Sequence, residues 1–106
     1  MLLKLPKSSE KFFWTKHAKT KMRQYQLSES RLKRVLRKSE RKEIGVAPGT
    51  IAIMQTIGTK KHPTEIWLMY QAIKKSKRIK IISAWRYPGR SPVGKLPPGA
   101  QEELPS

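Results

Sequence analysis

Histidine and lysine side chains near the start of this chain have the types and spacing for proton transfer beside a phosphate. His17 and Lys21 lie four residues apart, and residues at that spacing are neighbours on a helix surface. Histidine changes charge near neutral pH, so His17 is a candidate for proton transfer and Lys21 for phosphate binding. The alternative is that His17 only flanks a helix.

A second histidine lies in a cationic stretch. His62 follows Lys60 and Lys61 and precedes Pro63, a residue typical of turns and loops. We treat Lys60, Lys61 and His62 as candidate nucleic-acid contacts, and His62 as a second candidate for proton transfer. A solvated loop histidine is the interpretation that we favour.

Positive charge is the strongest feature of the composition. The chain has 106 residues, with 24 Lys and Arg against 7 acidic residues, and a net charge of +17. Charge of this size repels itself in a compact fold, so we expect a polyanionic partner. Nucleic acid fits best, because Lys and Arg that neutralise phosphates release counterions. An anionic membrane surface is the alternative.

Missing residue types narrow the chemistry. The sequence has no Cys and no Asp, which excludes disulfides and thiolate zinc sites. We therefore predict no metal and no cofactor. The apolar start is too short for a signal peptide and no apolar run could span a membrane, so we expect a cytoplasmic protein with no membrane partner.

Two helices are predicted in the first half. Ala18, Met22 and Tyr25 recur at helical spacing, and Phe12–Thr15 before them could form a short strand. Ser28 is a good N-cap for a second helix. The buried face of that helix is Leu32, Val35 and Leu36, and its candidate phosphate-binding residues are Arg31, Arg34, Arg37 and Lys38.

Strands are predicted from residue 43 onward. Residues 50–57 alternate, and residues 65–73 are apolar on both faces, as an interior strand would be. A strand over 78–86 places Ile79, Ile81, Ser83 and Trp85 on one face. The cations predicted at this hairpin are Lys74, Lys75 and Lys77 at its tip and Lys80 beyond it.

This order predicts one α+β domain with two N-terminal helices packed on a three- to four-stranded antiparallel sheet. We place the domain at residues 12–88, after a flexible leader at 1–11. Residues 89–106 are rich in Pro and Gly and are predicted to form a disordered tail.

Two stretches resemble the RelE/ParE toxin superfamily. The sequence HAKTKMRQYQLS at 17–28 is similar to the H-A-x-x-R-M pattern of an uncharacterised family related to BrnT-type toxins. The sequence IKIISAWR at 79–86 resembles the last strand of BrnT-type proteins. Lys21 and Tyr25 stand where the uncharacterised family has Arg.

The resemblance implies a RelE/BrnT-like fold and a metal-independent endoribonuclease of a toxin-antitoxin system. Its partners would be RNA, as messenger RNA or on the ribosome, and an antitoxin protein. In this chemistry the RNA 2′-hydroxyl attacks the neighbouring phosphate, helped by proton transfer and by cations.

Site residues follow from the same resemblance. Arg86 would bind phosphate at the end of the last strand, with Arg90 close by, and Tyr70 could donate a proton. The alternatives are a surface cation for Arg86 and a core residue for Tyr70. The alternative function is a non-catalytic, RNA- or ribosome-binding module on the same fold.

Overall fold

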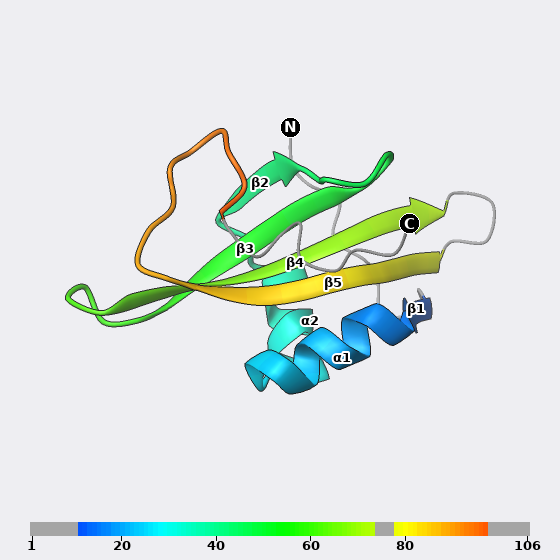
Figure 1. Cartoon of the computed structure of the whole chain (residues 1–106), viewed down its shortest axis with the longest axis horizontal. Helices are drawn as coiled ribbons and strands as arrows, with labels where there is room; N and C mark the ends of the chain where they lie inside the picture. The colour runs from blue at the N-terminus through cyan, green and yellow to red at the C-terminus, as the bar shows by residue number, and fades with distance from the viewer. Residues whose placement is uncertain (1–10, 74–77, 98–106) are drawn as a thin grey trace.

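The computed structural model describes residues 11–73 and 78–97. In chain order the elements are β1 (Lys11–Trp14), α1 (Lys16–Tyr25), α2 (Glu29–Arg37), β2 (Arg41–Ile44), β3 (Ile51–Gly58), β4 (Pro63–Ile73) and β5 (Arg78–Pro88). The strands form one sheet in the order β1-β5-β4-β3-β2. Both helices lie on the same side of this sheet (Figure 1), so the predicted α+β class with two helices is confirmed.

The predicted sheet of three or four antiparallel strands is wrong. Among the described residues the sheet has five strands, and it is mixed, because β1 pairs with β5 in the parallel direction. Phe12 lies opposite Ile79, near the other end of the domain. A pairing across that sequence distance leaves no local pattern, so the sequence shows β1 only as a short apolar run.

Hydroxyl side chains cap both helices. Thr15 Oγ1 accepts a hydrogen bond from the Ala18 N–H at 3.1 Å and donates one to the Ile81 carbonyl of β5 at 2.9 Å. The same side chain therefore starts α1 and ties it to the sheet. Ser28 Oγ accepts from the Arg31 N–H at 3.1 Å, which confirms the predicted cap of α2. Such caps contribute about 1 kcal/mol each.

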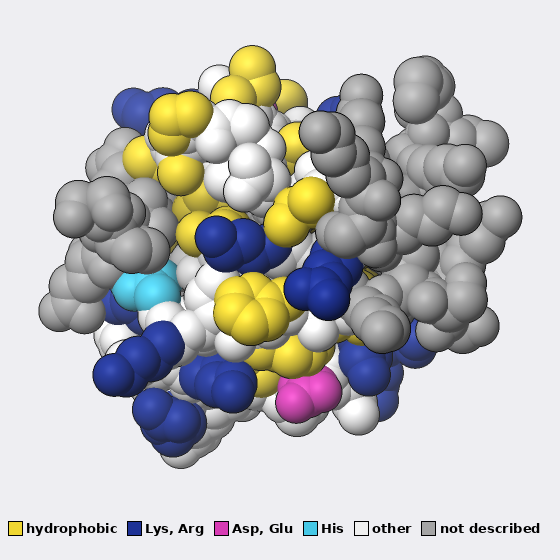
Figure 2. Space-filling model, turned by 90° about the vertical axis from the view of Figure 1, so that its right-hand side faces the viewer, with side chains coloured by type: hydrophobic (Ala, Val, Ile, Leu, Met, Phe, Trp, Pro, Cys, Tyr) yellow, Lys and Arg dark blue, Asp and Glu magenta, His cyan; other side chains and the backbone are white. Residues whose placement is uncertain are grey.

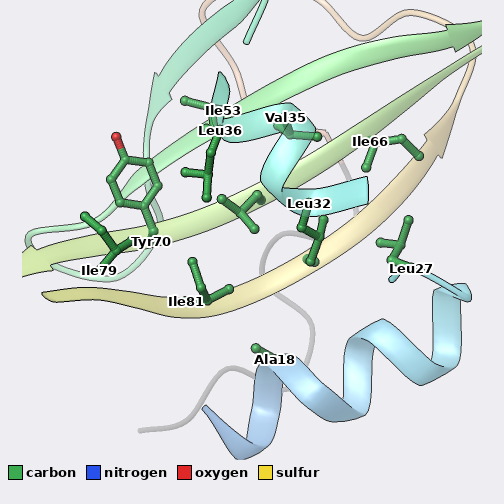
Figure 3. Packing of buried hydrophobic residues seen from close by; sticks show 12 residues of the cluster. Ala18, Leu27, Leu32, Val35, Leu36, Ile53, Ile66, Tyr70, Ile79 and Ile81 are labelled. Carbon is green, nitrogen blue, oxygen red and sulfur yellow. The ribbon is translucent and has the colours of Figure 1, made fainter. Parts of the chain in front are cut away.

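The main hydrophobic core lies between the helices and the sheet. The predicted apolar face of α2, Leu32, Val35 and Leu36, is buried there, and α1 contributes Ala18. Figure 3 shows these side chains beside those of the sheet, among them Ile53, Ile66, Tyr70, Ile79 and Ile81.

A β-bulge lies in the middle of β5. Met69 of β4 lies opposite Ser83, whereas the next residue, Tyr70, lies opposite Ile81. Ile82 is therefore an extra residue in β5. An extra residue changes which side chains face each side of the sheet beyond it.

The bulge overturns one prediction for this strand. Simple alternation placed Trp85 on the same face as Ile79 and Ile81. In the structure Ile79 and Ile81 pack in the core under the helices, while Trp85 joins Ile82 in a second cluster on the other face. Arg86 correspondingly turns toward the helices and contacts the end of α1.

The second cluster is built around two stacked indole rings. Trp67 of β4 and Trp85 of β5 lie with ring centroids 5.6 Å apart and planes 2° from parallel. Both side chains are fully buried, and Leu96 packs against the cluster. The two tryptophans are therefore core residues and do not offer a free surface for base stacking.

Residues 89–97, which we call the tail segment, return from the end of β5 toward β2 without forming a helix or strand (Figure 1). Arg41 of β2 donates to the Ser91 carbonyl at 2.9 Å and to Ser91 Oγ at 3.0 Å. Glu65 of β4 accepts from the Ser91 N–H at 3.0 Å. The predicted disorder is wrong for this segment, because polar side chains of the sheet hold it. Residues 98–106, and residues 1–10 of the predicted leader, lie outside the described residues.

Candidate nucleic-acid interface

Arg86 ties the last turn of α1 to β5. Its Nε donates to the Tyr25 carbonyl oxygen at 2.6 Å, and its Nη2 donates to the Gln26 carbonyl oxygen at 3.1 Å. The last carbonyls of a helix have no partner within it and form the negative end of its dipole, so a cation is favourable there. The guanidinium that was predicted to bind phosphate is thus engaged by main-chain carbonyls.

The three predicted catalytic residues are spread over the domain. His17 lies in the first turn of α1, whereas Arg86 contacts the last turn. With a rise of about 1.5 Å per residue, the two ends of this helix are roughly 12 Å apart along its axis. Tyr70 is buried in the core, and this burial raises its pKa above the usual value of 10.0. The fold therefore does not bring His17 and Arg86 to the same reacting group.

Lys21 lies inside the domain. Its side chain is 1% exposed, and its Nζ donates to Gln24 Oε1 at 3.2 Å. An ammonium in this position cannot meet a phosphate on the surface of the folded domain. The burial of Lys21 does not support its predicted phosphate contact, and the side chain is part of the packing around α1.

Other predicted cations lie on separate parts of the surface. Lys60, Lys61 and His62 are exposed in the turn between β3 and β4, at one end of the sheet (Figure 1). Lys80 is half-buried in β5, and Arg90 is exposed at the start of the tail segment. The predicted residues that fall outside the described part of the chain are Lys74, Lys75 and Lys77.

Three cations gather where α2 ends, and we call them the α2 cation cluster. Arg34 and Arg37 occupy the last turn of α2, and Lys38 is its C-cap. All three side chains are exposed. Together with Gln55 of β3 they line a cleft of about 250 Å³, and none of the described residues that line it is acidic. Arg31, also predicted, is half-buried in the first turn of the same helix.

The four acidic side chains in residues 11–73 and 78–97 do not line this cleft. Glu43 pairs with Arg41 at 3.0 Å, and Glu65 is buried with Oε2 3.6 Å from Arg41 Nη1. Glu40 accepts a main-chain N–H of β3 at 2.8 Å, and Glu29 lies in the first turn of α2, at the far end from the cluster. Glu40 is the acidic residue nearest in sequence to the cluster, two residues after Lys38, and the described lining of the cleft does not include it.

The surface at the end of the molecule near β1 is also rich in Lys and Arg. Figure 2 shows Lys and Arg side chains distributed among apolar ones there, with acidic side chains confined to one small area. Basic side chains interspersed with apolar ones suit contact with a nucleic acid better than with a cationic partner.

Arg41 and Glu65 form a buried polar centre that sequence reasoning missed. Glu65 accepts the Trp67 indole N–H at 2.9 Å and the Ser91 hydroxyl at 2.6 Å. The Arg41 guanidinium lies over the Trp67 ring, 4.9 Å from its centroid. One signal was available, because Glu65 is a single charge at the start of an otherwise apolar strand, and a buried carboxylate requires partners. These contacts hold the tail segment on the sheet.

The described residues contain no group of three His or Glu side chains placed to hold a metal ion. No helix among them has the length and apolar character needed to cross a membrane. Comparisons with models of known protein families, with curated proteins and with solved structures give no match. The resemblance to RelE/ParE toxins therefore stays a prediction from two stretches of sequence.

Proposed function

We propose that this protein binds RNA through the α2 cation cluster. The observation that carries the proposal is the cleft at the end of α2, where three exposed cations and no acidic side chain of the described residues form the lining. Lys and Arg that are free of internal partners can neutralise phosphates and release their counterions. The net charge of +17 adds a long-range attraction for any polyanion.

The choice of RNA over other polyanions rests on sequence. The stretches at 17–28 and 79–86 resemble a superfamily that acts on RNA. Trp67 and Trp85 are buried, and Arg86 is hydrogen-bonded to main-chain carbonyls. The exposed Lys and Arg side chains are therefore the groups of the domain best suited to phosphate contact. We therefore propose that the RNA backbone lies at the end of α2, against the α2 cation cluster.

The proposal concerns binding and does not extend to RNA cleavage. His17 and Arg86 are at opposite ends of α1, and a proton-transfer pair must reach the same reacting group. Toxin activity and an antitoxin partner stay predictions of the resemblance. The geometry supports the non-catalytic RNA-binding module better.

RNA binding is tested by titrating a fluorescent single-stranded RNA with the full chain at several salt concentrations. We expect log K to fall linearly with log salt, and the triple variant R34A/R37A/K38A to reduce this slope by up to about 2, at about 0.7 per lost phosphate contact. The control is R78A/K95A, which removes exposed cations outside the cluster. Equal slopes for the triple variant and the wild type would refute the proposal.

A further inference from the structure

Gln55 is an uncharged residue in the lining of the cleft at the end of α2. It lies in β3, between Ile53 and Ile57 on the strand face that packs toward the helices. Its Oε1 is buried and has no hydrogen-bond partner among the described residues. Buried polar atoms without partners are rare in folded proteins, and they concentrate at functional sites. The amide therefore needs an explanation beyond the packing of β3.

The size and lining of the cleft limit what it can hold. Its volume of about 250 Å³ is below the roughly 300–1,000 Å³ of pockets that enclose whole small molecules. No aromatic side chain in the described part of the chain lines it, although aromatic rings are a common platform for an unpaired base. A phosphate with its adjoining sugar suits this space better than a complete nucleotide.

We infer that the cleft binds one ribose–phosphate unit of RNA and that the Gln55 amide recognises the ribose 2′-hydroxyl. The phosphate lies among Arg34, Arg37 and Lys38, which supply the charge. The 2′-hydroxyl is close to the 3′-phosphate in the same nucleotide, so a small cleft can hold both groups. This inference rests on the proposed RNA binding and adds to it a basis for telling RNA from DNA.

The chemistry of the two groups is complementary. A 2′-hydroxyl both donates and accepts hydrogen bonds, and a glutamine amide carries an acceptor oxygen beside a donor nitrogen. Rotation of the amide by half a turn exchanges these two atoms, so Gln55 can present either one to the sugar. The amide atom that faces the cleft would make this contact, since Gln55 is one of the residues that line it.

The test compares three single-stranded oligonucleotides of one base sequence, with ribose, 2′-deoxyribose or 2′-fluoro sugars. We expect the wild-type chain to bind the ribose form roughly threefold to tenfold more tightly than the other two, as one hydrogen bond would give. Gln55→Leu is expected to bring these ratios close to one. R78A/K95A should weaken binding to all three strands by the same factor and leave the ratios unchanged.

The outcomes separate this inference from the proposed function. A Gln55→Leu variant that keeps the wild-type preference for ribose overturns the 2′-hydroxyl contact and leaves RNA binding in place. Equal wild-type affinity for the three sugars overturns it in the same way, and this measurement needs no variant to fold. If the wild-type chain shows no salt-dependent binding to any of the three strands, the proposed function and this inference are both overturned.

Discussion

The guanidinium of Arg86 and the carbonyl oxygen of Tyr25 are joined by a hydrogen bond of 2.6 Å. This bond connects β5 to the last turn of α1. The Gln26 carbonyl accepts a second bond from the same side chain, and Gln26 itself has a left-handed backbone conformation at the helix end. Arg86 is thus placed to hold the turn from α1 to α2 in position.

Arg86→Ala should destabilise the fold. We expect the free energy of unfolding to fall by about 1–3 kcal/mol, because charged hydrogen bonds are lost and two carbonyls lose a donor. Urea denaturation followed by circular dichroism measures this change. Arg34→Ala is the matched control, since it removes an exposed cation with no partner in the described chain and should change stability by less than about 0.5 kcal/mol. Unchanged stability together with weaker RNA binding in Arg86→Ala would instead support a phosphate contact.

The local parts of the fold could be predicted from sequence because their causes are local. Ser28 caps α2, and Leu32 and Leu36 are buried at helical spacing, as predicted. The bulge at Ile82 and the parallel pairing of Phe12 with Ile79 depend on which strands become neighbours. No short-range pattern carries that information, so the side chains beyond the bulge were assigned to the wrong faces.

The pH dependence of stability should show the burial of Tyr70. Burial raises the pKa of Tyr70 above 10.0 in the folded protein, whereas an exposed tyrosine in the unfolded chain ionises near 10. As the pH rises above about 10, the Tyr70 hydroxyl therefore loses its proton in the unfolded chain before it does so in the folded protein. The free energy of unfolding therefore decreases, and the loss is complete once the pH passes the folded pKa.

Tyr70→Phe removes this effect because it keeps the ring and lacks the hydroxyl. We expect the stability difference between the wild type and Tyr70→Phe to be constant up to about pH 9 and then to shift against the wild type. Urea unfolding at a series of pH values up to about 11 measures it. A difference that stays constant over the whole range would contradict the burial of the phenol.

The link between Arg41 and the tail segment gives a third prediction. Arg41→Met leaves the buried Glu65 carboxylate without its cation, and breaking a buried pair in this way costs about 3–5 kcal/mol. The amide of Ser91, which donates to Glu65, should then exchange its hydrogen faster. Hydrogen exchange measured by NMR tests this. Lys42→Met, an exposed neighbour on β2, is the control, and equal exchange in both variants would contradict the link.

The candidate site was only partly predictable from sequence, because it too depends on which elements become neighbours in the fold. Arg34, Arg37 and Lys38 were identified from charge and helical spacing, and the structure gathers them around one cleft. Gln55 was not identified, because nothing in an alternating strand shows that a helix end will lie over it. Lys21 was proposed as a phosphate contact because it lies one helical turn after His17, and the structure buries its side chain.

Gln55 and its neighbour Thr56 provide a paired test of stability against function. Gln55 Oε1 and Thr56 Oγ1 are both buried without partners in the described chain, and as adjacent strand residues they face opposite sides of the sheet. Gln55→Leu and Thr56→Val should each raise the free energy of unfolding by about 1 kcal/mol, because an unsatisfied polar atom is removed. Of these two residues, Gln55 lines the cleft at the end of α2 and Thr56 does not. We therefore expect Gln55→Leu, and not Thr56→Val, to reduce the preference for ribose over deoxyribose. If Thr56→Val reduced that preference equally, the effect would come from repacking of β3, and the 2′-hydroxyl contact would be excluded.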